Sequence, residues 1–185
     1  MRKHILSLFF VFITAFTGAF APVFAGEKEG GIKWMTIDEV QVAMQKQPRR
    51  VIMDVYTDWC GWCKVMDKKT FTNPEVIDYV NKNFYAVKFN AETTDSIRFG
   101  GKMWGPTPGN KANSLAVEMV RGQLSYPTTV ILEKGFQNPQ PIPGYLDVPT
   151  MEVILHYFVE DQYSKKVTFV DYQKAYKPGW KVLVP

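Results

Sequence analysis

The chain has 185 residues, 46% hydrophobic and 22% charged, with a formal net charge of +4 at pH 7. This length and composition are typical of one globular domain, and they exclude a repeat array or a low-complexity chain. The lysines and arginines form no basic stripe with interleaved aromatic residues, so we expect no nucleic-acid partner.

The first 25 residues have the three-part pattern of a secretory signal peptide. A basic start, MRKH, precedes an uncharged stretch from Ile5 to Ala21, and the small residues Val23 and Ala25 fit cleavage after Ala25. The alternative is an uncleaved anchor, because 17 uncharged residues are near the lower limit for crossing a bilayer. Either way, the body of the protein is expected to be exported, for example to a periplasm.

The first elements of the domain follow closely on one another. Lys33–Gln47 is predicted to be a helix, in which Thr36 and Glu39 can form a capping box. Arg50–Asp58 is a β-branched apolar run that predicts a mostly buried strand. A single acid, Asp54, interrupts this run.

Two helices and a strand are predicted next. Cys60–Phe71 turns helical, and Asn73–Phe84 has a strong helix start, with Asn73 as the cap and Pro74 at the first helical position. Tyr85–Glu92 then predicts a second strand.

A long segment, Thr93–Ala112, separates this strand from the next predicted helix. Part of it can form a small hairpin that turns at Gly100–Gly101. Loops of this length in a compact domain are usually functional or mobile. We therefore keep two interpretations, an element that faces the substrate and a decoration of the domain.

The second half of the chain is predicted to contain two adjacent strands, with one helix before them and two helices after them. The predicted elements are a helix at Asn113–Gln123, strands at Tyr126–Glu133 and Gln140–Asp147, and helices at Val148–Tyr163 and Val167–Tyr176. Strands that alternate with helices predict a parallel unit, and the two late strands predict a hairpin. The expected fold class is therefore α/β with a mixed sheet.

Cys60 and Cys63 are the only cysteines of the chain. Disulfides persist in exported compartments, but a bridge across two residues closes a tiny loop and stabilises the fold little. Two thiolates fall short of a closed zinc site, since His4 lies in the signal peptide and His156 is expected to be a packing residue. A linear Cu(I) site remains an alternative.

Redox chemistry explains the spacing of the two cysteines better. Cys60 lies where a strand runs into a helix N-terminus, whose unpaired N–H groups and dipole favour a thiolate. Cys63 follows one helical turn later and can resolve a mixed disulfide formed by Cys60.

The segment DVYTDWCGWCK resembles the active-site segment of the thioredoxin family. Asp54 lies six residues before Cys60, as the family's acid does, and Lys88, Pro127 and Gly144 occupy matching positions. The resemblance covers about residues 33–163. It implies a thioredoxin fold, with a mixed central sheet flanked by helices and an insertion before the strand that Pro127 opens. Residues 26–32 would then be a flexible N-terminus, and 164–185 a C-terminal extension.

The resemblance also implies roles for these residues. Cys60 would be the attacking nucleophile and Cys63 the resolving thiol. Asp54 would be a buried acid that exchanges a proton with Cys63, and Lys88 would moderate its raised pKa. Pro127 would be cis and leave room for a substrate strand. The alternatives are that Asp54 is only a satisfied core residue and that Lys88 is a solvated charge.

Four further residues are expected to contact the substrate, namely Trp59, Gly61, Trp62 and Tyr126. The dipeptide between the cysteines is Gly61–Trp62, whereas thioredoxin has Gly-Pro, and Tyr126 before the proline is another departure. These departures leave the substrate and the redox potential open. Trp62 can also be an exposed residue without a role in specificity.

The predicted function is that of an exported thiol–disulfide oxidoreductase acting on proteins, with reductase favoured over oxidase. It would need no cofactor or metal, and it would exchange electrons with a membrane donor or acceptor. The alternatives are a disulfide-donating oxidase and a non-catalytic binding or chaperone module.

Overall fold

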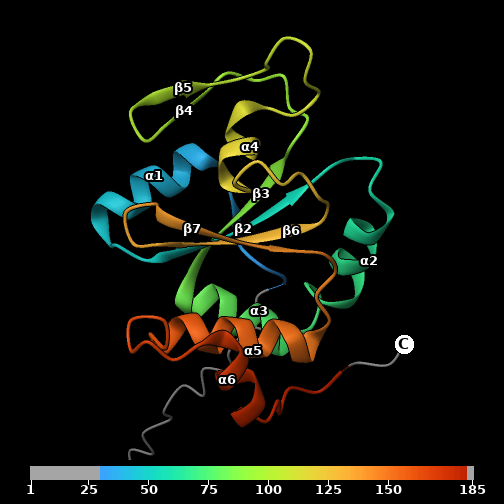
Figure 1. The fold of residues 1–185 in the computed structure, drawn as a ribbon, viewed down its shortest axis with the longest axis vertical. Helices are drawn as coiled ribbons and strands as arrows, with labels where there is room; N and C mark the ends of the chain where they lie inside the picture. Colours follow the sequence, from blue (N-terminus) through green and yellow to red (C-terminus); the bar gives the residue numbers. More distant parts are fainter. Residues whose placement is uncertain (1–29, 183–185) are drawn as a thin grey trace, which may run out of the picture.

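The computed structural model describes residues 30–182, so the predicted signal peptide lies outside the described residues. A five-stranded sheet with the strand order β1-β3-β2-β6-β7 forms the centre of the molecule (Figure 1). Its strands are β1 (Trp34–Met35), β2 (Arg50–Tyr56), β3 (Phe84–Asn90), β6 (Thr128–Glu133) and β7 (Gln137–Pro143). The helices are α1 (Ile37–Lys46), α2 (Gly61–Lys69), α3 (Pro74–Asn83), α4 (Ser114–Met119), α5 (Val148–Val159) and α6 (Phe169–Ala175).

The sheet is mixed, which confirms the predicted fold class. Strands β1 and β2 run parallel to β3, whereas β6 is antiparallel to β2 and β7 is antiparallel to β6. The two central strands, β2 and β3, pair along their whole length, and β2 also pairs with β6. Strand β2 therefore lies in the interior of the sheet, with a partner strand on each side.

Helices cover both faces of the sheet (Figure 1). Successive residues of a strand point to opposite faces. On β2, Val51, Met53 and Val55 pack into a core with α1 and α4, whereas Ile52 packs into a second core with α2, α3 and α5. By the same alternation, Asp54 points to the face that carries α2.

The first predicted helix begins later than expected. Thr36 is its N-cap and forms the predicted capping box with Glu39, so α1 starts at Ile37 rather than at Lys33. The residues before the cap, Trp34 and Met35, instead pair with β3. This pairing joins residues far apart in the chain, which no local pattern could indicate.

The second edge strand also differs from the prediction. Strand β7 spans Gln137–Pro143, not Gln140–Asp147, and it contains Pro139, Pro141 and Pro143. Because β7 lies at the edge of the sheet, alternate backbone N–H positions need no partner strand, and proline is tolerated there. Helices α4 and α5 are shorter than predicted and end at Met119 and Val159, and the other predicted elements are present with small differences at their ends.

The long segment before α4 contains the predicted hairpin. Strands β4 (Ile97–Phe99) and β5 (Lys102–Trp104) are antiparallel and are joined by Gly100–Gly101, both with positive φ. Phe99 is buried in the core beneath α1, and the side-chain amide of Gln41 donates to the carbonyl of Arg98. The hairpin lies beyond α1 and α4, away from α2 (Figure 1).

Both ends of the described chain pack onto the domain. Ile32, in the segment expected to be flexible, is buried in the core beneath α3 and α5. At the other end, the Glu152 side chain on α5 is 3% exposed and accepts hydrogen bonds from the Tyr176 hydroxyl and from the backbone N–H groups of Gly179 and Trp180. The residues after α5 are therefore held on the domain by a buried carboxylate.

None of the helices within residues 30–182 is long and apolar enough to cross a membrane.

We predict that Glu152→Ala lowers the free energy of unfolding by about 2–3 kcal/mol, because the tyrosine hydroxyl and two backbone N–H groups lose a charged acceptor. Urea unfolding measures the change. The control is Glu118→Ala on the exposed side of α4, which should change stability by less than about 0.5 kcal/mol. Equal stability of the two variants would contradict the anchoring role of Glu152.

Candidate active site

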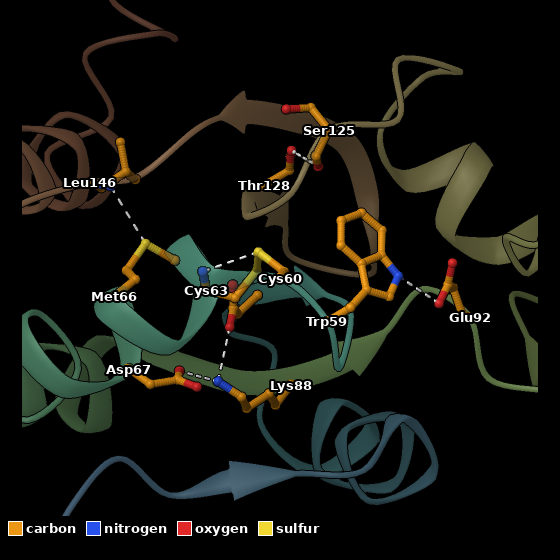
Figure 2. Close-up of a disulfide and its surroundings, with 11 residues drawn as sticks. Trp59, Cys60, Cys63, Met66, Asp67, Lys88, Glu92, Ser125, Thr128 and Leu146 are labelled. Atoms are coloured by element: carbon orange, nitrogen blue, oxygen red, sulfur yellow. Dashed lines mark hydrogen bonds and ion pairs between the residues drawn. A yellow bond between two sulfur atoms is a disulfide. The ribbon is translucent and has the colours of Figure 1, made fainter.

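Cys60 and Cys63 form a disulfide at the N-terminus of α2, with their Cα atoms 5.3 Å apart (Figure 2). Cys60 is the N-cap of the helix, and its Sγ accepts a hydrogen bond from the backbone N–H of Cys63 at 3.1 Å. The turn before the helix is closed by the N–H of Cys60, which donates to the carbonyl of Thr57. A helix N-terminus with an N–H aimed at sulfur favours the negative charge of a thiolate.

The two sulfur-bearing residues are almost buried. Cys60 is 4% exposed and Cys63 is 2% exposed. Of the pair, Cys60 lies at the outer end of α2 and Cys63 one turn further in. The order fits an outer sulfur that meets a partner first and an inner sulfur that acts second.

Asp54 lies on β2, on the face of the sheet covered by α2, and its side chain is fully buried. Its neighbours across the sheet are Lys88 on β3 and Thr129 on β6. Burial raises the pKa of Asp54 to about 6, although the charge and hydrogen bond of Lys88 act in the opposite direction. Among residues 30–182, Oδ1 of Asp54 has no hydrogen-bond partner. Asp54 can therefore gain or lose a proton near neutral pH.

Lys88 is shared between two carboxylates. Its Nζ lies 3.1 Å from Oδ2 of Asp54 and also forms an ion pair with Asp67 (Figure 2). Burial acts to lower the pKa of Lys88, but Asp54 and Asp67 together raise it above its ordinary value. Lys88 is thus not the solvated charge of the alternative interpretation.

Three aromatic rings around Lys88 also hold its ammonium group in place. Nζ lies 5.1–5.6 Å from the centroids of three rings, those of Trp34, Tyr56 and Phe71. Such cation–π contacts stabilise a partly desolvated ammonium. They keep Lys88 beside Asp54 and Asp67.

The loop before β6 borders the disulfide from the other side. The Tyr126–Pro127 peptide bond is cis, as the resemblance implies. The carbonyl of Pro127 accepts from the N–H of Gly144, and the hydroxyl of Thr128 donates to the carbonyl of Ser125. These two contacts fix the loop between β6 and the segment that leads into α5.

Exposed aromatic side chains flank the disulfide. Trp59 is 66% exposed and Trp62 is 62% exposed, whereas the Gly61 between them carries no side chain. Trp59 packs edge-on against Tyr126 and donates from Nε1 to Oε2 of Glu92 at 2.9 Å (Figure 2). On the other side, the Trp62 ring lies 5.5 Å from the ring of Tyr145.

The residues predicted from the sequence therefore gather around one disulfide, and three further residues join them. Asp67, Glu92 and Tyr145 were missed. Asp67 lies one helical turn after Cys63, and this spacing could have indicated it. Glu92 and Tyr145 reach the site from other elements, and the sequence carried no signal for them.

The structure also places His156 and the side chains of the types that bind metal ions. His156, the expected packing residue, stacks on the ring of Tyr79 at 4.5 Å and bonds to Glu160. Within the described residues, no group of three or more His, Cys, Asp or Glu side chains could hold a metal ion.

Comparisons with known proteins agree with this geometry. A family model described as Thioredox_DsbH, a protein of unknown function, DUF255, matches residues 19–99. The chain is 28% identical over 124 residues to the thiol:disulfide interchange protein DsbD of Salmonella typhi, and 27% identical over 123 residues to that of Escherichia coli strain K12. Both alignments cover 65% of this chain but 19% of the relative.

A solved structure of a thioredoxin-fold protein from Helicobacter pylori matches with a TM-score of 0.54 at 16% identity, covering 82% of this chain and 90% of that chain. This similarity shows the fold. The mixed sheet, the helices on both faces and the disulfide at the start of α2 define a thioredoxin-fold protein with a CxxC pair. The sequence similarity to the Thioredox_DsbH family over residues 19–99, and to DsbD over 124 residues, is in keeping with this fold.

Removal of the Asp54 carboxylate is predicted to stabilise the oxidised protein at alkaline pH. The folded protein holds the Asp54 proton more tightly than the unfolded chain does, because burial raises the pKa to about 6. This group's contribution to stability therefore falls as the pH rises from about 4 to about 6 and stays low above it. We expect Asp54→Asn to be more stable than the parent by about 1–3 kcal/mol at pH 8.

Urea unfolding of the oxidised proteins at pH 4 and pH 8 measures this difference, which should nearly vanish at pH 4. Asp78→Asn, at an exposed position of α3, is the control and should show no such pH dependence. A gain for Asp54→Asn that is the same at both pH values would contradict the raised pKa.

The two partners of Asp54 are predicted to shift its pKa in opposite directions. Lys88→Met removes a cation that lowers the pKa of Asp54, so the pKa should rise above about 6. Asp67→Asn removes a negative charge that raises it, so the pKa should fall. A carbon-detected NMR titration of the Asp54 carboxyl group in the oxidised protein measures both shifts, with Lys68→Met on α2 as an exposed control. If both variants shift the pKa of Asp54 in the same direction, the opposite electrostatic effects of Lys88 and Asp67 on Asp54 are contradicted.

Proposed function

We propose that the chain is an exported thiol–disulfide oxidoreductase that exchanges disulfides with protein substrates through Cys60 and Cys63. The observation that carries this proposal is the disulfide at the N-terminus of α2, where the N–H of Cys63 points at Sγ of Cys60. The buried Asp54–Lys88 pair, on the face of the sheet that α2 covers, supports it. A pair used only as a structural staple would need neither feature.

The proposed reaction begins with the reduced protein. The Cys60 thiolate attacks one sulfur of a substrate disulfide and forms a mixed disulfide, and the other substrate sulfur leaves as a thiolate that takes up a proton. Cys63 then gives its proton to Asp54 and attacks Sγ of Cys60. The Cys60–Cys63 disulfide forms again, and the second substrate sulfur leaves. Two electrons have passed from the protein to the substrate.

The remaining residues around the site have supporting roles in this scheme. Lys88 keeps the pKa of Asp54 from rising further, and Asp67 shares the charge of Lys88. Pro127 has no N–H and leaves the backbone beside the disulfide open to a substrate strand. Four residues, Trp59, Gly61, Trp62 and Tyr126, form the surface that the substrate meets.

We further propose that the protein works as a reductase outside the cytoplasm. Export is supported by the pattern of residues 1–25, and the reductive direction by the Asp54–Lys88 pair together with the WCGxC segment. A reductase in an oxidising compartment requires a source of electrons, so we propose a membrane partner as the donor. No metal or organic cofactor takes part in the proposed reaction.

The test is the reduction potential of the Cys60–Cys63 pair, measured by equilibration with thiol buffers and trapping of free thiols. A reductase should have a potential nearer to about −270 mV, the value of thioredoxin, than to about −120 mV, the value of a strong periplasmic oxidase. A value near the second figure would make the protein a disulfide donor.

Two cysteine variants test the proposed order of attack in a separate experiment with substrate proteins. Cys63→Ser should accumulate a mixed disulfide between Cys60 and a substrate protein, because resolution is blocked, whereas Cys60→Ser should form none. If the parent protein does not cycle between its two redox states, the oxidoreductase proposal is wrong and a binding module takes its place.

A further inference from the structure

Two aromatic pairs border the disulfide, one on each side. Trp59 packs with Tyr126, with ring centroids 5.9 Å apart, and Trp62 packs with Tyr145 at 5.5 Å. The two indoles are among the most exposed large apolar side chains described, although the cysteines between them are nearly buried. The sulfur of a partner must therefore approach the disulfide between the rings of Trp59 and Trp62. The residues on either side of the partner's cysteine then contact these rings.

The segment that carries Tyr145 is fixed in place rather than loose. The N–H of Gly144 donates to the carbonyl of Pro127 at 2.8 Å. On the other side of Tyr145, the N–H of Leu146 donates to Sδ of Met66 at 3.5 Å (Figure 2). The carbonyl of Leu146 accepts from the hydroxyl of buried Thr70 at 2.6 Å. Tyr145 is thus held between the cis-proline loop and α2, where its ring supports Trp62.

The two sides of the disulfide differ in the partners of their aromatic side chains. On the Trp59 side, the Asn90 amide donates to the Asp58 carboxylate, and the Asn90 carbonyl oxygen accepts from the N–H of Glu92, so that one side chain links two acidic residues. Figure 2 shows Glu92 beside Trp59, with Leu146 across the disulfide from them. Neither Trp62 nor Tyr145 has a charged partner among residues 30–182. The carboxylates of Asp58 and Glu92 thus lie on the Trp59 side, whereas on the other side the Trp62 and Tyr145 rings pack against each other.

We infer that the Trp62–Tyr145 pair selects substrates with an aromatic or large aliphatic residue next to the reacting cysteine, and that Asp58 and Glu92 select a basic residue on the other side of it. This inference rests on the proposed function. The rings supply apolar surface and stacking, and the carboxylates supply charge complementarity. The partner is therefore a polypeptide segment in which the cysteine lies between a basic and a large apolar residue.

The test uses short peptides of the form Ala-X-Cys-Z-Ala, each held as a mixed disulfide with 2-nitro-5-thiobenzoate. Cys60 of the reduced protein attacks the peptide sulfur, a protein–peptide disulfide forms, and the coloured thiobenzoate leaves. Cys63 then attacks Cys60, and the peptide leaves as a thiol. Release of the coloured anion in a stopped-flow instrument gives the rate of the first step.

The peptides compare Lys and Phe in both orders around the cysteine with Ala on both sides and with Glu in place of Lys. We expect the better Lys–Phe order to react about fivefold faster than the Ala peptide, in line with the strength of aromatic pairs. Trp62→Ala and Tyr145→Ala should each reduce this Phe preference, taken as the ratio of the rate with the Phe peptide to the rate with the Ala peptide, by at least about half. Glu92→Gln should reduce the preference for Lys over Glu, and this preference should weaken at high salt.

Tyr163→Ala, which removes an exposed ring located after α5, is the matched control and should keep both preferences. Equal rates for the Phe and Ala peptides, or a Phe preference that survives in both Trp62→Ala and Tyr145→Ala, would overturn the inference and leave the exchange activity intact. Failure of every peptide to release thiobenzoate would instead show that the proposed function itself is wrong.

Discussion

A single carboxylate buried beneath the active-site helix constrains the rest of the site. Asp54 lies on a strand with a partner strand on each side, and its side chain is fully buried. An unpaired charge at a buried position is costly. The fold meets this constraint with Lys88, which lies opposite Asp54 in the register of the two central strands. The buried carboxylate of Asp54 thus requires a cation beside it, and the pairing of β2 with β3 places Lys88 there.

The cation is not used for Asp54 alone. Asp67 on α2 binds the same ammonium group, so the active-site helix is tied to the central sheet through a charge as well as through apolar packing. Three aromatic rings around Lys88 restrict its movement further. Asp54, Lys88 and helix α2 are therefore connected through ion pairs. A change in the protonation or charge of one of these groups alters the electrostatic interactions of the others.

Local signals allowed much of this arrangement to be predicted from the sequence. The capping box at Thr36 and the cysteine spacing depend on residues close together in the chain, whereas the cis bond at Pro127 was expected from the resemblance to the thioredoxin family. The features that were missed depend on distant contacts. Trp34 joined a strand instead of a helix because β3 lies beside it, and Tyr145 reached Trp62 through a loop whose path the sequence does not encode locally. The bounds of β7 were misplaced because they depend on its pairing with β6, in which Gln137 lies opposite Glu133.

The carboxylate of Glu152 has a consequence for the order in which the domain is completed. Its acceptor oxygens are filled by Tyr176, Gly179 and Trp180, so α5 keeps a buried charge without its hydrogen bonds until those residues have been synthesised. The nascent domain would therefore lack these hydrogen bonds until Trp180 had left the ribosome.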